Sequence, residues 1–231
     1  MPTKRTLNKP RAVVLLSGGL DSATALYVAK AEGYRLYALS FDYGQKHKRE
    51  LEAACATARA AEVEVHHIIQ MDLSLWGGSS LTDKEQNIED GDLSRRVIPF
   101  TYVPARNMVF LSVAASFAEA VGAYAIFIGV SEMDYSGYVD CRQEFLTAME
   151  EAINKGTVCA VEAGHKIKLY APFIQMTKWE EIRLGLKLGV DYGKTWSCYR
   201  GGEKPCGTCD SCLLRAEAFR KAGVPDPLTI G

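Results

Sequence analysis

The feature that most restricts the fold of this chain is a short apolar run that ends at two glycines and passes directly into a helical pattern. Residues 12–16 read Ala-Val-Val-Leu-Leu, and Ser17, Gly18 and Gly19 follow them. A strand that is apolar on both faces is typical of the middle of a parallel sheet covered by helices. Apolar residues at helical spacing then fill residues 20–32. The sequence therefore predicts an α/β fold that starts with a strand, a tight turn and a helix.

Strand-like and helix-like patterns alternate along most of the chain. We expect strands at 12–16, 35–41, 63–70, 124–130 and 166–170, and helices at 20–32, 46–62, 106–121, 141–154, 177–188 and 210–222. The helix at 106–121 is apolar almost all round, which predicts that it is buried. Thr177 and Glu180 stand in capping-box register. This order of elements implies a doubly wound parallel sheet.

The order of elements also predicts where a ligand binds. Ligands of doubly wound sheets bind at the carboxyl ends of the strands, so we expect residues 17–22, 41–47 and 129–142 to lie close together. The polar segment 71–101 shows no sustained period and is predicted to be a long loop with room for a short helix. Loops of this length are often functional lids, and the sequence leaves open whether this one closes over a site.

The turn after the first strand, residues 16–22, has the composition of an anion-binding loop. Its two glycines allow the backbone to approach a phosphate, which the N–H groups and positive dipole end of the next helix would hold. Ser17 and Ser22 add hydroxyl donors, and Asp21 suits a Mg²⁺ bridge. The turn has neither the lysine of a Walker A loop nor a G-x-G-x-x-G pattern. The alternative is an ordinary strand–helix turn in which Asp21 is only a helix charge.

Four cysteines crowd together near the end of the chain. Cys198, Cys206, Cys209 and Cys212 are separated by seven, two and two residues. Four thiolates that close a tetrahedron describe a structural zinc site. An iron–sulfur cluster is the alternative, but the x3-Cys-Pro that continues ferredoxin-type runs is not found after Cys212. Cys141, inside a polar stretch, is expected to be a packing residue, and a chemical role for it is left open.

Polar side chains also follow other predicted strands. Asp42, Gln45 and His47 come after the second strand. Arg106 opens a predicted helix, where its charge opposes the dipole, so it needs an anion such as a phosphate or a carboxylate. An ion pair with a nearby acid is the alternative for this arginine.

The stretch 129–142 holds three acids, two tyrosines and an arginine. Such a set suits a polar heterocycle, because carboxylates can accept from the N–H edge of a guanine-like ring and tyrosine can stack on its face. Asp140 could instead cap the helix that follows.

Composition limits the partners and the compartment. The 27 basic and 28 acidic residues give a net charge of −1, which does not favour RNA or DNA as a substrate. The first residues contain no apolar h-region, and no apolar run approaches the length of a membrane span. We therefore expect a cytoplasmic protein with no membrane partner, whose seven cysteines stay reduced.

Two resemblances join these observations. Residues 16–22 resemble the SGGxDS loop of the ATP pyrophosphatase (PP-loop) family, which holds the β- and γ-phosphates while a nucleophile attacks the α-phosphorus. The ordered set formed by 16–22, 41–47, 103–107, 129–142 and the four cysteines resembles the 7-cyano-7-deazaguanine (preQ0) synthases of the QueC family. The match runs from residue 12 to about residue 215. Ala105 and Val139 depart from it, because many relatives have Gly and Pro there.

The resemblance implies a PP-loop core, similar to adenine nucleotide alpha hydrolases, in residues 1–190 and a small zinc-binding segment in residues 191–231. It implies a ligase that forms C–N bonds and converts ATP to AMP and pyrophosphate. The substrates would be 7-carboxy-7-deazaguanine and ammonia, and the nitrile would form through an acyl-adenylate and an amide. A homodimer, one structural zinc per chain and Mg²⁺ with ATP are also implied.

The site residues can then be assigned by position. ATP would be bound by Leu16, Ser17, Gly18, Gly19, Leu20, Asp21, Ser22, Ala23 and Thr24. The deazaguanine acid would be bound by Asp42, Gln45, His47, Arg106, Asn107, Glu132, Asp134, Tyr138, Asp140 and Arg142. Asp21, Ser22 and Arg106 are the expected catalytic groups. Three alternatives remain: a tRNA-modifying enzyme on the same core, an amidating synthetase that stops at the amide, and a nucleotide-binding regulatory module.

Overall fold

The computed structural model describes residues 9–94, 97–131 and 138–229. Within these ranges five parallel strands form one sheet in the order β3-β2-β1-β4-β5. The strands are β1 (Arg11–Leu15), β2 (Arg35–Asp42), β3 (Val65–Gln70), β4 (Ala125–Phe127) and β5 (Lys168–Tyr170). The strand order reverses at β1, which lies between β2 and β4. Sheets of this kind bind their ligands at such a reversal.

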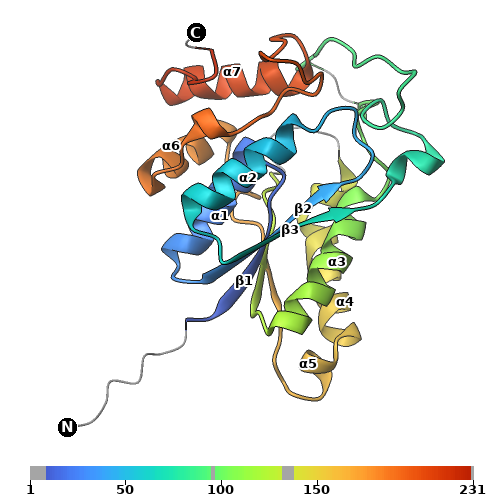
Figure 1. Cartoon of the computed structure of the whole chain (residues 1–231), viewed down its shortest axis with the longest axis vertical. Coiled ribbons are helices and arrows are strands. Elements are labelled where there is room, and N and C mark those ends of the chain that lie inside the picture. The colour runs from blue at the N-terminus through green and yellow to red at the C-terminus, as the bar shows by residue number, and fades with distance from the viewer. Residues whose placement is uncertain (1–8, 95–96, 132–137, 230–231) are drawn as a thin grey trace.

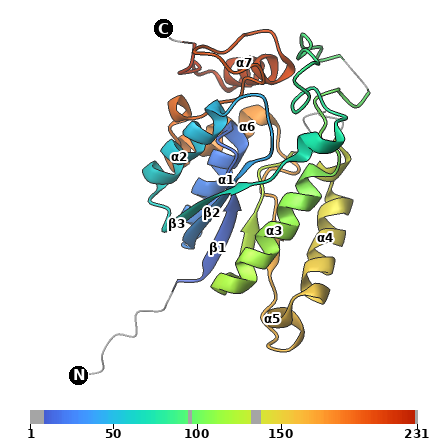
Figure 2. The same ribbon diagram turned by 45° about the vertical axis from the view of Figure 1, so that its right-hand side comes forward.

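Helices cover both faces of the sheet. They are α1 (Leu20–Ala31), α2 (Arg49–Ala61), α3 (Arg106–Val121), α4 (Gln143–Gly156), α5 (Val158–Val161), α6 (Lys178–Leu188) and α7 (Asp210–Ala222), with 3-10 turns η1 (Leu73–Trp76), η2 (Val139–Cys141) and η3 (Tyr192–Lys194). In Figures 1 and 2, α3 and α4 lie on one side of the sheet and α1 and α2 on the other. Neighbouring residues of β1 follow this division: Val13 shares an apolar cluster with α3, and Val14 shares one with α1. The doubly wound α/β fold is confirmed.

The differences from the predicted elements have local causes. The strand expected at 124–130 ends at Phe127. Gly129 lies against the turn at 16–22 instead, where a Cβ would stand 2.6 Å from the carbonyl carbon of Asp21. The expectation of a buried helix at 106–121 holds for one side only, because Met108 on the other side of α3 is 47 % exposed. The single-turn α5 is too short to show a period in the sequence.

The long segment 71–101 contains only η1 among its described residues, as expected for a loop. Its later part is tied to residues 196–215, called the cysteine segment below. Arg200 donates to the Ile88 carbonyl at 2.9 Å and to the Asp90 carboxylate at 2.8 Å. Gly91 N–H donates to the Thr208 carbonyl at 2.7 Å. These bonds hold residues 88–91 against the body of the protein.

The predicted capping box at the start of α6 is confirmed. The backbone N–H and the hydroxyl of Thr177 donate to the Glu180 carboxylate at 2.9 and 2.6 Å. Ile182 of α6 shares an apolar cluster with Phe219 of α7 and Leu20 of α1, so the end of the chain packs on the helix that follows β1. Among the described residues, no helix combines the length and the apolar character needed to cross a bilayer.

Candidate active site

The turn at residues 16–22, called the phosphate loop below after its predicted role, leaves the carboxyl end of β1 and enters α1. Gly18 has a φ of +88°, and a Cβ there would stand 2.0 Å from the Glu50 carbonyl oxygen, so a side chain would collide with α2. The hydroxyls of Ser17 and Ser22 are hydrogen-bonded at 3.0 Å, and Gly19 N–H donates to Ser17 Oγ at 3.3 Å. The loop is thus closed on itself, with Ser17, Gly19 and Ser22 facing a cavity.

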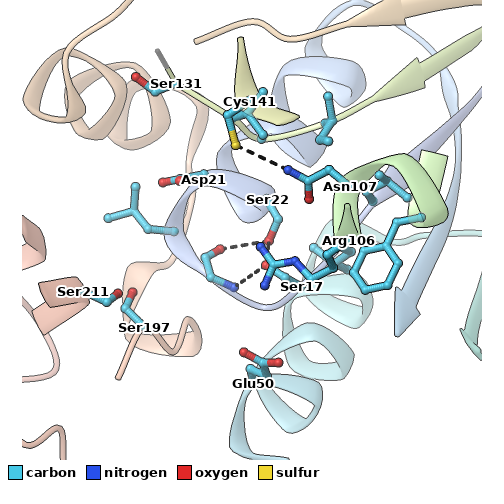
Figure 3. A pocket seen from close by; sticks show the side chains of 18 of the residues that line it. Ser17, Asp21, Ser22, Glu50, Arg106, Asn107, Ser131, Cys141, Ser197 and Ser211 are labelled. Atoms are coloured by element: carbon cyan, nitrogen blue, oxygen red, sulfur yellow. Dashed lines mark hydrogen bonds between the residues drawn. The ribbon is translucent and has the colours of Figure 1, made fainter. Parts of the chain in front are cut away.

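This cavity has a volume of about 280 Å³ and is shown in Figure 3. Its wall comes from the ends of β1 and β2, the residues after β4, the starts of α1, α2 and α3, and the cysteine segment. The stacked rings of Phe41 and Phe110, 3.9 Å apart, form an apolar side. An apolar hollow with a few converging polar groups is typical of a small-molecule site.

Arg106, the first residue of α3, projects into this cavity (Figure 3). Its Nη1 donates to the Tyr43 hydroxyl at 3.4 Å, and its guanidinium lies 5.7 Å from the Tyr43 ring centroid. In the described part of the chain no carboxylate forms an ion pair with it. The structural ion pair considered for this arginine is therefore not found there, and a guanidinium in this position favours an anionic ligand.

Lys178, the first residue of α6, is a cavity residue that the sequence analysis missed. Its Nζ lies 2.7 Å from the Asp21 carboxylate and 3.4 Å from the carboxylate of the buried Glu181. A signal was available, because a lysine in the first turn of a helix opposes the dipole in the same way as Arg106. The side chain brings a second positive charge to the phosphate loop.

Glu50, in the first turn of α2, is the second residue that was missed. It is partly buried and lines the cavity, and Figure 3 shows its carboxylate turned toward the cavity. Burial raises the pKa of Glu50 to about 7, although Arg106 and a hydrogen bond from Gln45 act in the opposite direction. In the sequence it is one acid in a charged helix, and nothing there marks it as different from its neighbours.

Asn107 and Asp140 form a buried junction between α3 and η2. Asn107 N–H donates to the Asp140 carboxylate at 3.0 Å, and its Nδ2 donates to the Asp140 carbonyl at 3.2 Å and to Cys141 Sγ at 3.3 Å. Asp140 therefore binds the first turn of α3 and not that of α4. Burial raises the pKa of Cys141 to about 12, so this thiol is protonated at neutral pH.

The structure brings only part of the predicted substrate set to the cavity. Arg106, Asn107 and Tyr138 line it. The carboxylate of Asp42 is paired with Lys48 at 2.6 Å, and Gln45 is buried beneath Tyr43. His47 lies against the cysteine segment, where a Cβ on Gly201 would stand 2.7 Å from the His47 Cβ.

The remaining predicted residues lie elsewhere. Arg142 is exposed before α4, and Glu132 and Asp134 fall outside the described residues. In the phosphate loop and α1, Gly18, Ala23 and Thr24 do not line the cavity, and Thr24 is hydrogen-bonded to Tyr192 at 2.9 Å. The ligand roles of all these residues stay predictions.

The four cysteines of the C-terminal cluster meet as the spacing predicted. Their sulfur atoms all lie within 4.8 Å of one another, and Cys206 Sγ is 3.9 Å from Cys212 Sγ. Zinc–sulfur bonds of about 2.3 Å in a tetrahedron place the sulfurs about 3.8 Å apart. Backbone N–H groups of Cys206 and Cys209 point at neighbouring sulfurs, at 3.3 and 3.4 Å. The donor set fits a single tetrahedral ion, whereas a cluster of several irons would hold its thiolates further apart.

The cysteine segment is tied directly to the phosphate loop. Trp196 N–H donates to the Gly18 carbonyl at 2.8 Å. Ser197 and Ser211 lie on the cavity wall, as Figure 3 shows. Behind them, Arg215 forms a buried ion pair with Asp226 at 2.7 Å and donates to Thr195 Oγ1 at 2.8 Å. One side of the cavity therefore depends on how residues 196–215 are folded.

Comparison with known proteins places these features in a family. The family model described as queuosine biosynthesis protein QueC matches residues 11–223. A curated 7-cyano-7-deazaguanine synthase from Clostridium kluyveri is 57% identical over 218 residues, which cover 94% of this chain and 96% of that protein. One from Trichodesmium erythraeum is 54% identical over 221 residues, covering 94% and 99%.

A solved structure shares the fold at low sequence identity. The NMN synthetase from Francisella tularensis is 15% identical, with a TM-score of 0.50. The match covers 94% of this chain and 79% of that one. At this identity the likeness concerns the fold alone.

Proposed function

The chain belongs to the queuosine biosynthesis protein QueC family, and from that premise we propose that it converts 7-carboxy-7-deazaguanine and ammonia to 7-cyano-7-deazaguanine in an ATP-dependent reaction. Curated relatives with more than half of their aligned residues identical carry the name 7-cyano-7-deazaguanine synthase. The structural observation that carries the proposal is that the phosphate loop and Arg106 line one cavity.

The first chemical task is to make a carboxylate reactive. A carboxylate is a poor acyl electrophile. Attack of its oxygen on the α-phosphorus of ATP would expel pyrophosphate and give an acyl-adenylate, from which AMP can leave in the next step. Two anions must approach each other in this step, so positive charge and N–H donors are needed around them. The phosphate loop would hold the β- and γ-phosphates, and Arg106 would hold the carboxylate or the α-phosphate.

The charge of the triphosphate is met by two further groups. Mg²⁺ that arrives with ATP would neutralise part of it, and Asp21 and Ser22 offer the oxygen donors that this ion prefers. Lys178 holds Asp21 at 2.7 Å and adds positive charge at the same end of the cavity. Asn107 and Tyr138, which also line the cavity, would contact the deazaguanine ring.

The remaining steps convert the adenylate to a nitrile. Ammonia displaces AMP and gives the amide. The amide oxygen is adenylated by a second ATP, and elimination of AMP leaves the nitrile. A ligase of this type therefore uses two ATP for each product.

The cysteine cluster supports a structural role for zinc. Cys198, Cys206, Cys209 and Cys212 would close its coordination and leave no position for substrate. The ion would fix the segment that carries Trp196 and Ser197 in the cavity wall.

Three further assignments complete the proposal. We keep the division into an ATP-binding part, 1–190, and a C-terminal segment, 191–231, although α6 and α7 share one apolar cluster. The homodimer is supported by the family resemblance. A cytoplasmic location is supported by the seven cysteines, none of which forms a disulfide in the described residues.

One experiment tests the proposed reaction. Purified protein is mixed with MgATP, ammonium and 7-carboxy-7-deazaguanine, and products are followed by mass spectrometry with AMP counted per product. We expect the nitrile with two AMP. An amide that accumulates with one AMP would identify an amidating enzyme, and a lack of ATP turnover would refute the proposed substrate.

A further inference from the structure

A second, smaller cavity lies beside the main one. Its volume is about 40 Å³, and it shares Tyr43, Glu50, Arg106 and Tyr199 with the main cavity. On this measure a water molecule needs about 10–15 Å³. The small cavity therefore has room for a few molecules of that size and none for a nucleotide or a heterocycle. It can hold a small polar molecule next to the reacting groups.

Glu50 is the carboxylate that the two cavities have in common. Gln45 Nε2 donates to its Oε1 at 3.2 Å, and Gln45 is itself fixed by bonds to the backbone of Tyr43 and Phe41 at 2.7 and 3.1 Å. No described residue donates to Oε2 or forms an ion pair with this side chain. One oxygen is thus oriented by the protein, and the other is left for a ligand.

The other groups on the shared wall are poor proton acceptors at neutral pH. Arg106 is a cation, and burial raises the pKa of Tyr43 to about 12. The other carboxylate of the main cavity, Asp21, is paired with Lys178. Glu50, whose pKa burial raises to about 7, is suited to take up and release protons near neutrality. The titratable or charged groups that surround Glu50 are Tyr43, Lys46, His47, Arg106 and Tyr199.

We propose that the small cavity is the binding site for ammonia and that Glu50 accepts the protons which the nitrogen loses. This inference rests on the proposed function. Ammonia is bound as the neutral molecule, because the guanidinium of Arg106 shares the wall and disfavours ammonium.

The proton balance shows what the acceptor must do. In the first half, the nitrogen lone pair attacks the acyl carbon, the C–N bond forms, the C–O bond to AMP breaks with its electron pair, and one proton passes from nitrogen to Glu50. In the second half, adenylation of the amide oxygen and elimination of AMP each release one N–H proton. Glu50 passes each proton to water before the next step.

The test compares two reactions of the same protein. Exchange of pyrophosphate into ATP that depends on 7-carboxy-7-deazaguanine needs no ammonia, whereas amide and nitrile formation need it. In Glu50→Gln we expect the exchange rate to stay within about twofold of the wild type. Nitrile formation should fall by roughly 10² or more, the usual contribution of a general base. The wild-type kcat, extrapolated to saturating ammonia, should decrease as the pH is lowered below about 7, the pKa of Glu50. This acidic limb of the pH profile should be absent from the variant.

Two further variants serve as controls. Glu50→Asp keeps a carboxylate and should retain the pH limb at a reduced rate. Glu52→Gln alters an exposed acid of the same helix and should behave as the wild type.

The outcomes separate the two proposals. Wild-type protein that makes neither amide nor nitrile overturns the proposed function and this inference with it. Wild-type turnover together with an unchanged ammonia KM and pH profile in Glu50→Gln overturns only the inference. A parallel loss of exchange, with a raised KM for the heterocyclic acid, would show that Glu50 holds the heterocycle and would overturn it as well.

Discussion

Two segments that form walls of the main cavity, the phosphate loop and the cysteine segment, are held in place by different interactions. The phosphate loop is a run of consecutive residues, closed by short-range hydrogen bonds and supported by the backbone of α2 beneath Gly18. The cysteine segment is held by four sulfurs and by the buried pair of Arg215 and Asp226. The first wall is built from neighbours in the sequence, and the second from partners brought together by folding. A change in one of these walls should therefore leave the other intact.

Removal of one thiolate should give the largest effect, confined to the second wall. In Cys206→Ser we expect less than one zinc per chain and a Tm lowered by roughly 10 °C, because metal binding is coupled to folding. Activity should be lost while the far-ultraviolet dichroism of the helices around the sheet persists. Metal analysis and thermal unfolding check this. Cys55→Ser, outside the cluster, is the control, and a metal-replete, active Cys206→Ser would contradict the dependence of this wall on the sulfurs.

Arg106 lines the cavity from the start of α3 and belongs to neither of these two segments, so its removal tests whether they suffice for activity. We expect Arg106→Ala to lower the rate of nitrile formation by roughly 10²–10³, because the charge that opposes the carboxylate and phosphates is removed. Arg106→Lys keeps the charge without the planar guanidinium, so its rate should lie between those of the wild type and Arg106→Ala. Steady-state kinetics measure the effect. Turnover of Arg106→Ala at the wild-type rate would mean that the loop and the cysteine segment act without it.

Gly18→Ala disturbs the first wall alone. The new Cβ would meet the Glu50 carbonyl at 2.0 Å with a φ of +88°, so α2 must shift, and we expect a loss of about 3 kcal/mol in the free energy of unfolding. Gly33→Ala is a matched control, because its φ is +86° but nothing lies within 4 Å. It should cost only about 1 kcal/mol of backbone strain. If urea unfolding gave the same loss of unfolding free energy for Gly18→Ala and Gly33→Ala, the contact with α2 would be unimportant.

Glu50 lies where the walls meet, and its effect on stability should be the smallest. Its pKa is about 7 in the folded protein against an ordinary value of 4.5, so between these values the folded state holds a proton that the unfolded chain has released. The associated stability is present below about pH 4.5 and is lost as the pH rises through 7. Glu50→Gln should therefore be more stable than the wild type by roughly 2–3 kcal/mol near pH 8, with a smaller difference near pH 5. Denaturant unfolding at both pH values measures this, and a difference that does not vary with pH would contradict the raised pKa.

The features that could be predicted from the sequence are those built from residues close together in the chain. The tight strand-to-helix turn at 16–22, the capping box of Thr177 and the meeting of the four cysteines depend on short spacings, and the structure has all three. Glu50 and Lys178 acquire their positions only when α2 and α6 pack beside β1, so no local pattern separates them from other surface charges. The alternative interpretation of Asp140 as a cap of the helix that follows it met the same limit, because its partner Asn107 is contributed by α3.

The bond between Trp196 and Gly18 also matters for inhibition. Cys206 is only partly buried, whereas its three companions are buried. An electrophile that modifies Cys206 from solvent would remove one of the four sulfurs of the cluster. We expect this to loosen Trp196 and deform the loop at residues 16–22 without any group entering the main cavity. Such a compound need not resemble ATP or a purine.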